Sequence, residues 1–158
     1  MNPVHLHLML NHVPVLGVAF GLALVGLSLW LKSEELKKVS LGFLIVIAAL
    51  SIPAYLTGEP AEKIVEDLPG VSEDAIEQHE EAAQVAFVGV LIVGAAALCG
   101  LFFFRGESRV PNWLSATVLV MSVIVFALMA WTANLGGLIR HPEIRPDFHA
   151  ATKTEKPG

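Results

Sequence analysis

The chain has 158 residues, of which 54% are hydrophobic and only 16% charged, and its mean hydropathy is positive. This composition excludes an ordinary soluble domain, and the formal net charge of -5, concentrated in the acidic stretch 59–81, excludes nucleic acid as a partner. The single cysteine, Cys99, excludes an intrachain disulfide and a thiolate metal cluster.

Four segments of the chain contain no Asp, Glu, Lys or Arg: residues 1–31, 39–58, 82–104 and 110–139. Each is long enough to cross about 30 Å of hydrocarbon at a rise of about 1.5 Å per residue. Lipid offers no partners to backbone polar groups, and the segments lack the alternating pattern of barrel strands. The sequence therefore predicts an all-α integral membrane protein, folded as an up-down four-helix bundle.

The first helix is predicted to begin almost at the start of the chain. Asn2 and Pro3 suit an N-cap and a first helical residue, and the apolar run continues to Leu31. Pro14 removes one amide donor inside this helix, which predicts a kink just after His12.

The next two helices are separated by a polar segment. The second helix is predicted from Val39 to Tyr55, and the turn-forming residues 57–60 separate it from a short amphipathic helix outside the membrane. Ser72, which two acidic residues follow, is the predicted N-cap of a third helix that continues to Phe104.

The fourth helix is predicted from Asn112 to Leu135, where the glycine pair 136–137 stops it. No repeat or linker divides the chain into separately folding units. We therefore expect one transmembrane domain over residues 1–145 and a flexible tail over residues 146–158.

Lys and Arg in the short loops indicate the orientation in the membrane, because cytoplasmic loops carry an excess of both. The pattern predicts a protein of the bacterial inner membrane with its two tight loops in the cytoplasm. Both termini and the acidic loop then lie in the periplasm. The cytoplasmic end carries Lys32, Lys37, Lys38, Arg105 and Arg109, and the periplasmic end carries Lys63, Arg140 and Arg145.

The alternating path of the helices brings many ionisable side chains to the periplasmic end. Such groups at membrane depth are costly and usually serve a site. His5 and His12 are seven residues apart and share a helix face, whereas His7 is predicted to point elsewhere. The converging residues are His5, His7, His12, Glu59, Glu62, His79, Glu80, Arg140 and His141.

Two histidines from different helices, at equal depth, are what a bis-histidine haem b requires. His12 and His79 are predicted to meet this requirement, and Gly17 and Gly21 to leave room beside the porphyrin or a neighbouring helix. Such a protein would pass electrons to or from a quinol or a larger respiratory complex. The other expected cofactor contacts are His5, His141 and, toward a propionate, Arg140.

Two other interpretations stay open. One is a cofactor-free accessory subunit or small-solute permease whose polar cluster stabilises the helix ends. The other is a non-haem site for zinc, iron or copper. Its ligands would be His5, His7 or His12 together with His79 and Glu59, Glu62 or Glu80. For every interpretation, assembly into a homo-oligomer also stays open.

Several motifs resemble a family of predicted four-helix bacterial membrane proteins catalogued as a domain of unknown function. They are the run HLHLMLNHVP at residues 5–14 and the segments 55–62, 79–80 and 132–143. The resemblance covers most of the chain and implies the four-helix fold, but it implies no activity. By architecture alone, the chain is also broadly similar to small b-type cytochromes.

Overall fold

The computed structural model describes residues 2–66, 68, 71–106 and 109–141, which contain helices but no strands. The prediction of an all-α fold is confirmed. The helices are α1 (Pro3–Leu10), α2 (His12–Trp30), α3 (Glu34–Leu56), α4 (Gly58–Val65), α5 (Glu73–Phe103) and α6 (Asn112–Arg140). Four stretches are long and apolar enough to cross a membrane: Pro3–Trp30, Glu34–Val65, Glu73–Phe103 and Asn112–Ile139.

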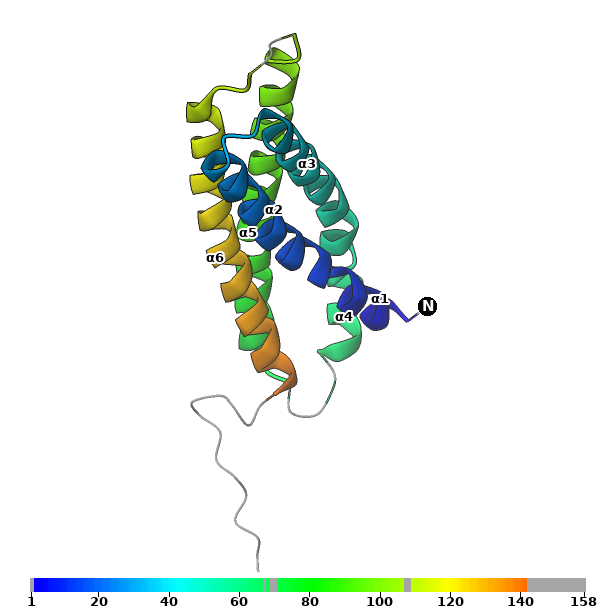
Figure 1. Ribbon diagram of the computed structural model, residues 1–158. Coiled ribbons are helices and arrows are strands. Elements are labelled where there is room, and N and C mark those ends of the chain that lie inside the picture. Colours follow the sequence, from blue (N-terminus) through cyan, green and yellow to red (C-terminus); the bar gives the residue numbers. More distant parts are fainter. Residues whose placement is uncertain (1, 67, 69–70, 107–108, 142–158) are drawn as a thin grey trace, which may run out of the picture.

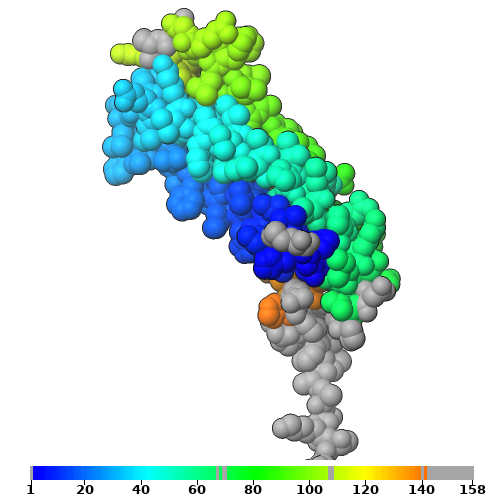
Figure 2. Space-filling view, turned by 90° about the vertical axis from the view of Figure 1, so that its right-hand side faces the viewer, coloured from blue at the N-terminus to red at the C-terminus, as the bar shows by residue number. Residues whose placement is uncertain are grey.

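The long helices α2, α3, α5 and α6 form a four-helix bundle (Figure 1). Each packs against its neighbour in chain order, and α6 closes the ring by packing against α2. The short helices α1 and α4 pack against each other beside the bundle (Figure 2). We call the end of the molecule that carries α1, α4, the start of α5 and the end of α6 the α1/α4 end.

Side-chain caps determine where three of the helices begin. Asn2 Oδ1 accepts a hydrogen bond from the Val4 amide at 2.9 Å, and Ser72 Oγ accepts one from the Ala75 amide, as the sequence predicts. Ser33 caps α3 in the same way, so this helix begins about one turn before the predicted start at Val39.

The first membrane-length stretch is divided by a turn at Asn11, between the end of α1 at Leu10 and the start of α2 at His12. Pro14 has no amide hydrogen to donate to the Leu10 carbonyl, which is the reason for the kink predicted just after His12; the interruption lies before His12 instead, at Asn11. Asn11 itself keeps right-handed helical dihedral angles, φ -64° and ψ -22°, and α1 packs against α4.

The predicted end of the fourth helix at Leu135 is wrong, because α6 continues through Gly136 and Gly137 to Arg140. A glycine inside a helix costs only about 1 kcal/mol relative to alanine, which packing against another helix offsets. Gly136 has such packing, since a Cβ there would lie 3.0 Å from Cε1 of His79 on α5.

Glycines on α2 allow α3 to approach its backbone closely. A Cβ at Gly17 would overlap the side chain of Ile47, and a Cβ at Gly21 would overlap that of Leu44. Helix packing therefore accounts for this pair. The expectation that the two glycines leave room beside a porphyrin is wrong, because side chains of α3 fill the space.

A buried lysine holds together the end of the bundle opposite the α1/α4 end. Lys37 on α3 is 2% exposed, and its Nζ donates to Glu34 Oε1 at 2.8 Å, to the Val110 carbonyl at 3.2 Å and to Asn112 Oδ1 at 2.6 Å. Glu34 Oε2 accepts a hydrogen bond from the Val110 amide at 2.8 Å. The ammonium group thus has three acceptors for its three donors, and α3 is tied to the start of α6.

Replacing this lysine should destabilise the protein strongly. Lys37→Met leaves the Glu34 carboxylate and the Asn112 amide without their partner, and we expect the free energy of unfolding to fall by about 3 kcal/mol. Reversible unfolding in mixed micelles, followed by circular dichroism, measures the change. The matched control is Lys63→Met, whose pair with Glu59 is mostly exposed, and it should have no measurable effect. Equal effects of the two substitutions would contradict this assignment.

Candidate functional site

Two histidines from distant parts of the chain lie near each other at the α1/α4 end. His7 on α1 and His79 on α5 are both partly buried, and they are close enough to interact electrostatically. We call these two residues the imidazole pair. From the sequence, His12 was the expected haem partner of His79, and His7 was named as a partner of His79 only for the non-haem site.

The histidine expected to face His79 has a different environment. His12, at the start of α2, is exposed, and its Nδ1 donates to the Leu8 carbonyl at 2.8 Å. His5 on α1 is exposed as well. The physical reason is helical periodicity, because His5 and His12 are seven residues apart and share one face, which is exposed, whereas His7 lies on the other side of the helix and is partly buried.

His79 is held in one tautomer by α6. Its Nδ1 lies 2.9 Å from the Thr132 carbonyl oxygen, which can only accept, so Nδ1 carries the hydrogen. The neutral ring therefore keeps its lone pair on Nε2. The close approach of α6 depends on Gly136, where any Cβ would press against the ring.

His7 is held in the same tautomer through a hydroxyl group. Its Nδ1 lies 3.2 Å from Thr57 Oγ1, and this hydroxyl already donates its hydrogen to the Ala54 carbonyl at 2.8 Å. The ring of His7 also hydrogen-bonds to the backbone of Ala54, so its N–H faces two acceptors, the Thr57 hydroxyl and the Ala54 carbonyl. Gly58 follows at the start of α4 and leaves space beside the ring, since a Cβ there would lie 3.7 Å from His7 Cε1.

The imidazole pair thus consists of two rings with the same protonation pattern. Nδ1 of each ring is bonded to the protein, and within the described residues Nε2 of each has no hydrogen-bond partner. Metal-binding imidazoles are usually fixed in this way, with one nitrogen on a backbone or side-chain acceptor and the other directed to the metal. The pair can therefore supply two nitrogen ligands from two helices.

Carboxylates at this end of the molecule do not complete a conventional metal site. Glu62, partly buried on α4, and Glu80, exposed on α5, interact electrostatically with each other. Glu59 is exposed and paired with Lys63 at 2.6 Å. In the part of the chain that the structure describes, no group of three or more His, Cys, Asp or Glu residues is placed to hold a metal ion.

The last two expected site residues lie at the end of α6. Arg140 is the final residue of α6, and the side chain of Arg140 lies outside the described part of the structure. His141 is exposed, and its amide donates to the Gly137 carbonyl at 3.0 Å. The predicted tail, residues 146–158, also lies outside the described residues.

An aromatic stack joins α3 to α5 near the imidazole pair. The rings of Tyr55 and Phe87 are parallel, at an angle of 3°, with their centroids 4.3 Å apart. Tyr55 precedes Thr57 by two residues, and Phe87 follows His79 by two helical turns. Sequence reasoning missed this contact, because nothing in the local pattern of either segment indicates its partner.

The roles of Thr57 and Gly136 were also missed from the sequence. Thr57 was interpreted as part of a turn, and Gly136 as a helix stop. The sequence did offer a signal for each, because both are small residues near a helix end. It did not indicate that a histidine ring lies beside each of them. Only the packing of α1 on α4 and of α5 on α6 shows which histidines those are.

Comparison of the chain with protein-family models, with curated proteins and with solved structures finds no match. The resemblance to a family of four-helix bacterial membrane proteins therefore stays a prediction from the motifs at residues 5–14, 55–62, 79–80 and 132–143.

The fixed tautomer of His79 provides a direct test of this geometry. In protein labelled with ¹⁵N-histidine, at a pH where the rings are neutral, the ring-nitrogen NMR signals of His79 should show hydrogen on Nδ1. Gly136→Ala should disturb this pattern, because the new methyl group displaces the ring from the Thr132 carbonyl. Gly137→Ala is the matched control, since a Cβ there meets nothing within 4 Å. The geometry is refuted if both variants give the unchanged spectrum.

Proposed function

We propose that the protein binds a b-type haem through the imidazole pair and passes electrons at the α1/α4 end. The supporting observation is the pair itself, His7 and His79, with Nδ1 of each ring bonded and Nε2 of each ring unpaired. A bound haem would supply one-electron redox chemistry. Its electron partner would be a quinol in the lipid or a larger respiratory complex.

The number of available nitrogen ligands supports this proposal. In a bis-histidine haem, the protein supplies only two ligands to the iron, and the two rings come from separate helices. The hydrogen bonds to Thr57 and to the Thr132 carbonyl fix both rings and increase the basicity of Nε2. The proposal therefore needs no further ligand from the chain.

A non-haem site for zinc, iron or copper is the second candidate. It requires at least three protein ligands, and the interaction between Glu62 and Glu80 is the observation that favours it. For this candidate, one of the two carboxylates would have to move to the imidazole pair. Bound metal found by elemental analysis in purified protein that has no Soret band separates it from the haem proposal.

The proposed membrane orientation has the α1/α4 end in the periplasm of a bacterium and α4 outside the hydrocarbon. Basic residues at the opposite end support it, because cytoplasmic loops favour Lys and Arg. One of them, Arg105, lies 4.5 Å above the ring of Phe102. This contact suits a membrane boundary, where a cation and an aromatic ring meet.

An absorption spectrum tests the haem proposal. After expression with ample haem, the purified protein should show a Soret band and, when reduced, the sharp visible bands of a six-coordinate b-type haem. His7→Ala and His79→Ala should each lose these bands, because each removes one of the two ligands. His12→Ala is the matched control and should keep them, since His12 is exposed and bonded to the Leu8 carbonyl.

The control also separates two assignments of the ligands. Loss of the bands in His12→Ala with retention in His7→Ala would support the ligands expected from sequence and reject those inferred from the structure. Absence of the bands from the wild-type protein would reject haem binding altogether.

Labelling of introduced cysteines tests the orientation. In a Cys99→Ala background, Glu66→Cys places a thiol at the end of α4, and Gly106→Cys places one in the loop after α5; both positions are exposed. A membrane-impermeant maleimide added to intact spheroplasts should label position 66 and leave position 106 unlabelled. The reverse pattern would invert the proposed orientation.

A further inference from the structure

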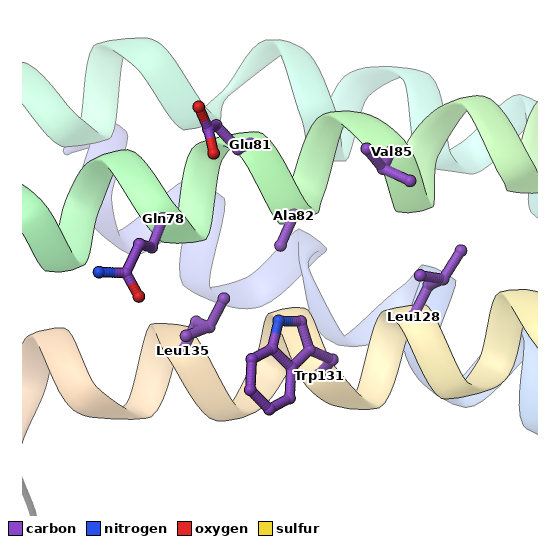
Figure 3. Close-up of a pocket in the computed structure, with 7 residues that line it drawn as sticks. All are labelled: Gln78, Glu81, Ala82, Val85, Leu128, Trp131 and Leu135. Atoms are coloured by element: carbon purple, nitrogen blue, oxygen red, sulfur yellow. The ribbon is translucent and has the colours of Figure 1, made fainter.

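An open groove lies between α5 and α6, on their outward surface (Figure 3). It has a volume of about 340 Å³, within the range of small-molecule sites. Four residues of α5 and three of α6 line it: Gln78, Glu81, Ala82, Val85, Leu128, Trp131 and Leu135.

The groove changes from polar to apolar along its length. Gln78 and Glu81 lie toward the α1/α4 end, and Figure 3 shows Gln78 extending toward α6 and Glu81 on the opposite rim of α5. Val85 and Leu128 lie further along the bundle. Trp131, which is 60% exposed, lies on α6 between these two ends. Such a gradient suits a ligand with a polar head group and an apolar tail.

The charge of the rim indicates which head group fits. Glu77, Glu80 and Glu81 are exposed acidic residues near the start of α5, and they would repel the phosphate of an anionic lipid. A neutral head group with O–H donors suits Glu81, whose carboxylate only accepts hydrogen bonds. Gln78 can donate and accept, and the indole of Trp131 offers an aromatic face to a ring.

The groove lies next to the imidazole pair along both helices. Gln78 precedes His79 on α5, and Trp131 precedes Thr132, whose carbonyl holds the His79 ring. Residues of the same helical turns thus form the groove on one side of the α5–α6 contact and hold His79 on the other.

We propose that this groove binds a quinol, with its hydroxylated ring between Glu81 and Trp131 and its apolar tail along Val85 and Leu128. The proposal deepens the proposed function and rests on it for the role of the ligand, because a quinol bound here lies across the α5–α6 contact from His79. The binding itself requires only the residues that line the groove.

Fluorescence of Trp131 tests the binding directly. Trp30→Phe and Trp113→Phe leave Trp131 as the only tryptophan, and the protein is reconstituted in phosphatidylcholine nanodiscs. Titration with decylubiquinol should quench the fluorescence saturably. Decylubiquinone should bind several-fold more weakly, because it has no O–H donor for Glu81.

Substitutions in this background locate the ligand. Glu81→Ala should weaken decylubiquinol binding about tenfold, since a charge-assisted hydrogen bond is lost. Ala82→Phe should abolish binding by filling the groove, provided that circular dichroism shows unchanged helicity. Glu77→Ala is the matched control and should bind normally, because Glu77 is an exposed acid of the same helix outside the groove.

Two results would overturn the proposal. One is quenching that does not saturate, or that is equal in all variants. The other is loss of decylubiquinol binding in nanodiscs of phosphatidylglycerol, which would assign the groove to an anionic lipid. The Soret band, measured on the same samples, distinguishes the two proposals: binding without the band rejects only the haem, and the band without binding rejects only the groove.

Discussion

The cost of leaving a polar group without a partner in apolar surroundings governs this structure. It favours helices in the four stretches that are long and apolar enough to cross a membrane. It also explains Lys37, which is buried at one end of the bundle with three acceptors around its ammonium group. At the other end, the same cost explains why His7 and His79 each direct Nδ1 to an oxygen of the neighbouring segment. Lys37, His7 and His79 therefore have defined positions, whereas Asn11 Oδ1, Ser115 Oγ and Ser122 Oγ are buried without a hydrogen-bond partner among the described residues.

The polar groups at the two ends of the bundle differ in how many of their hydrogen-bonding atoms have partners. Around Lys37 every donor of the ammonium group is satisfied, so the network holds α3 and α6 together and has no capacity left for a ligand. In the imidazole pair only one nitrogen of each ring is used. The remaining Nε2 atoms give this end of the molecule a capacity for coordination that the Lys37 end lacks. The groove beside His79, with Glu81 and Trp131, adds a surface suited to a lipid-soluble partner.

The choice of histidine illustrates where sequence reasoning succeeded and where it failed. His79 was expected to be a ligand, and it lies partly buried against α6. His12 was expected to face it because both were assigned the same depth in continuous helices. The exposed face of the stretch 3–30 carries His5 and His12, so His7 is the histidine that lies partly buried and close enough to His79 to interact electrostatically. Gly136 is a second example of the limit of local sequence signals. A glycine at this position predicts the end of a helix, but Gly136 lies inside α6, where it packs against His79.

The sequence by itself determined the features that depend on neighbouring residues: the four apolar stretches, the caps at Asn2 and Ser72 and the break near Pro14. These follow from hydrophobic length and from hydrogen bonds over two to four residues. Only the tertiary structure decided which imidazole turns inward and what fixes it. The bond between His7 and Thr57 joins residues 50 apart, and that between His79 and Thr132 joins residues 53 apart. Such contacts depend on how whole helices pack, and no local pattern records that packing.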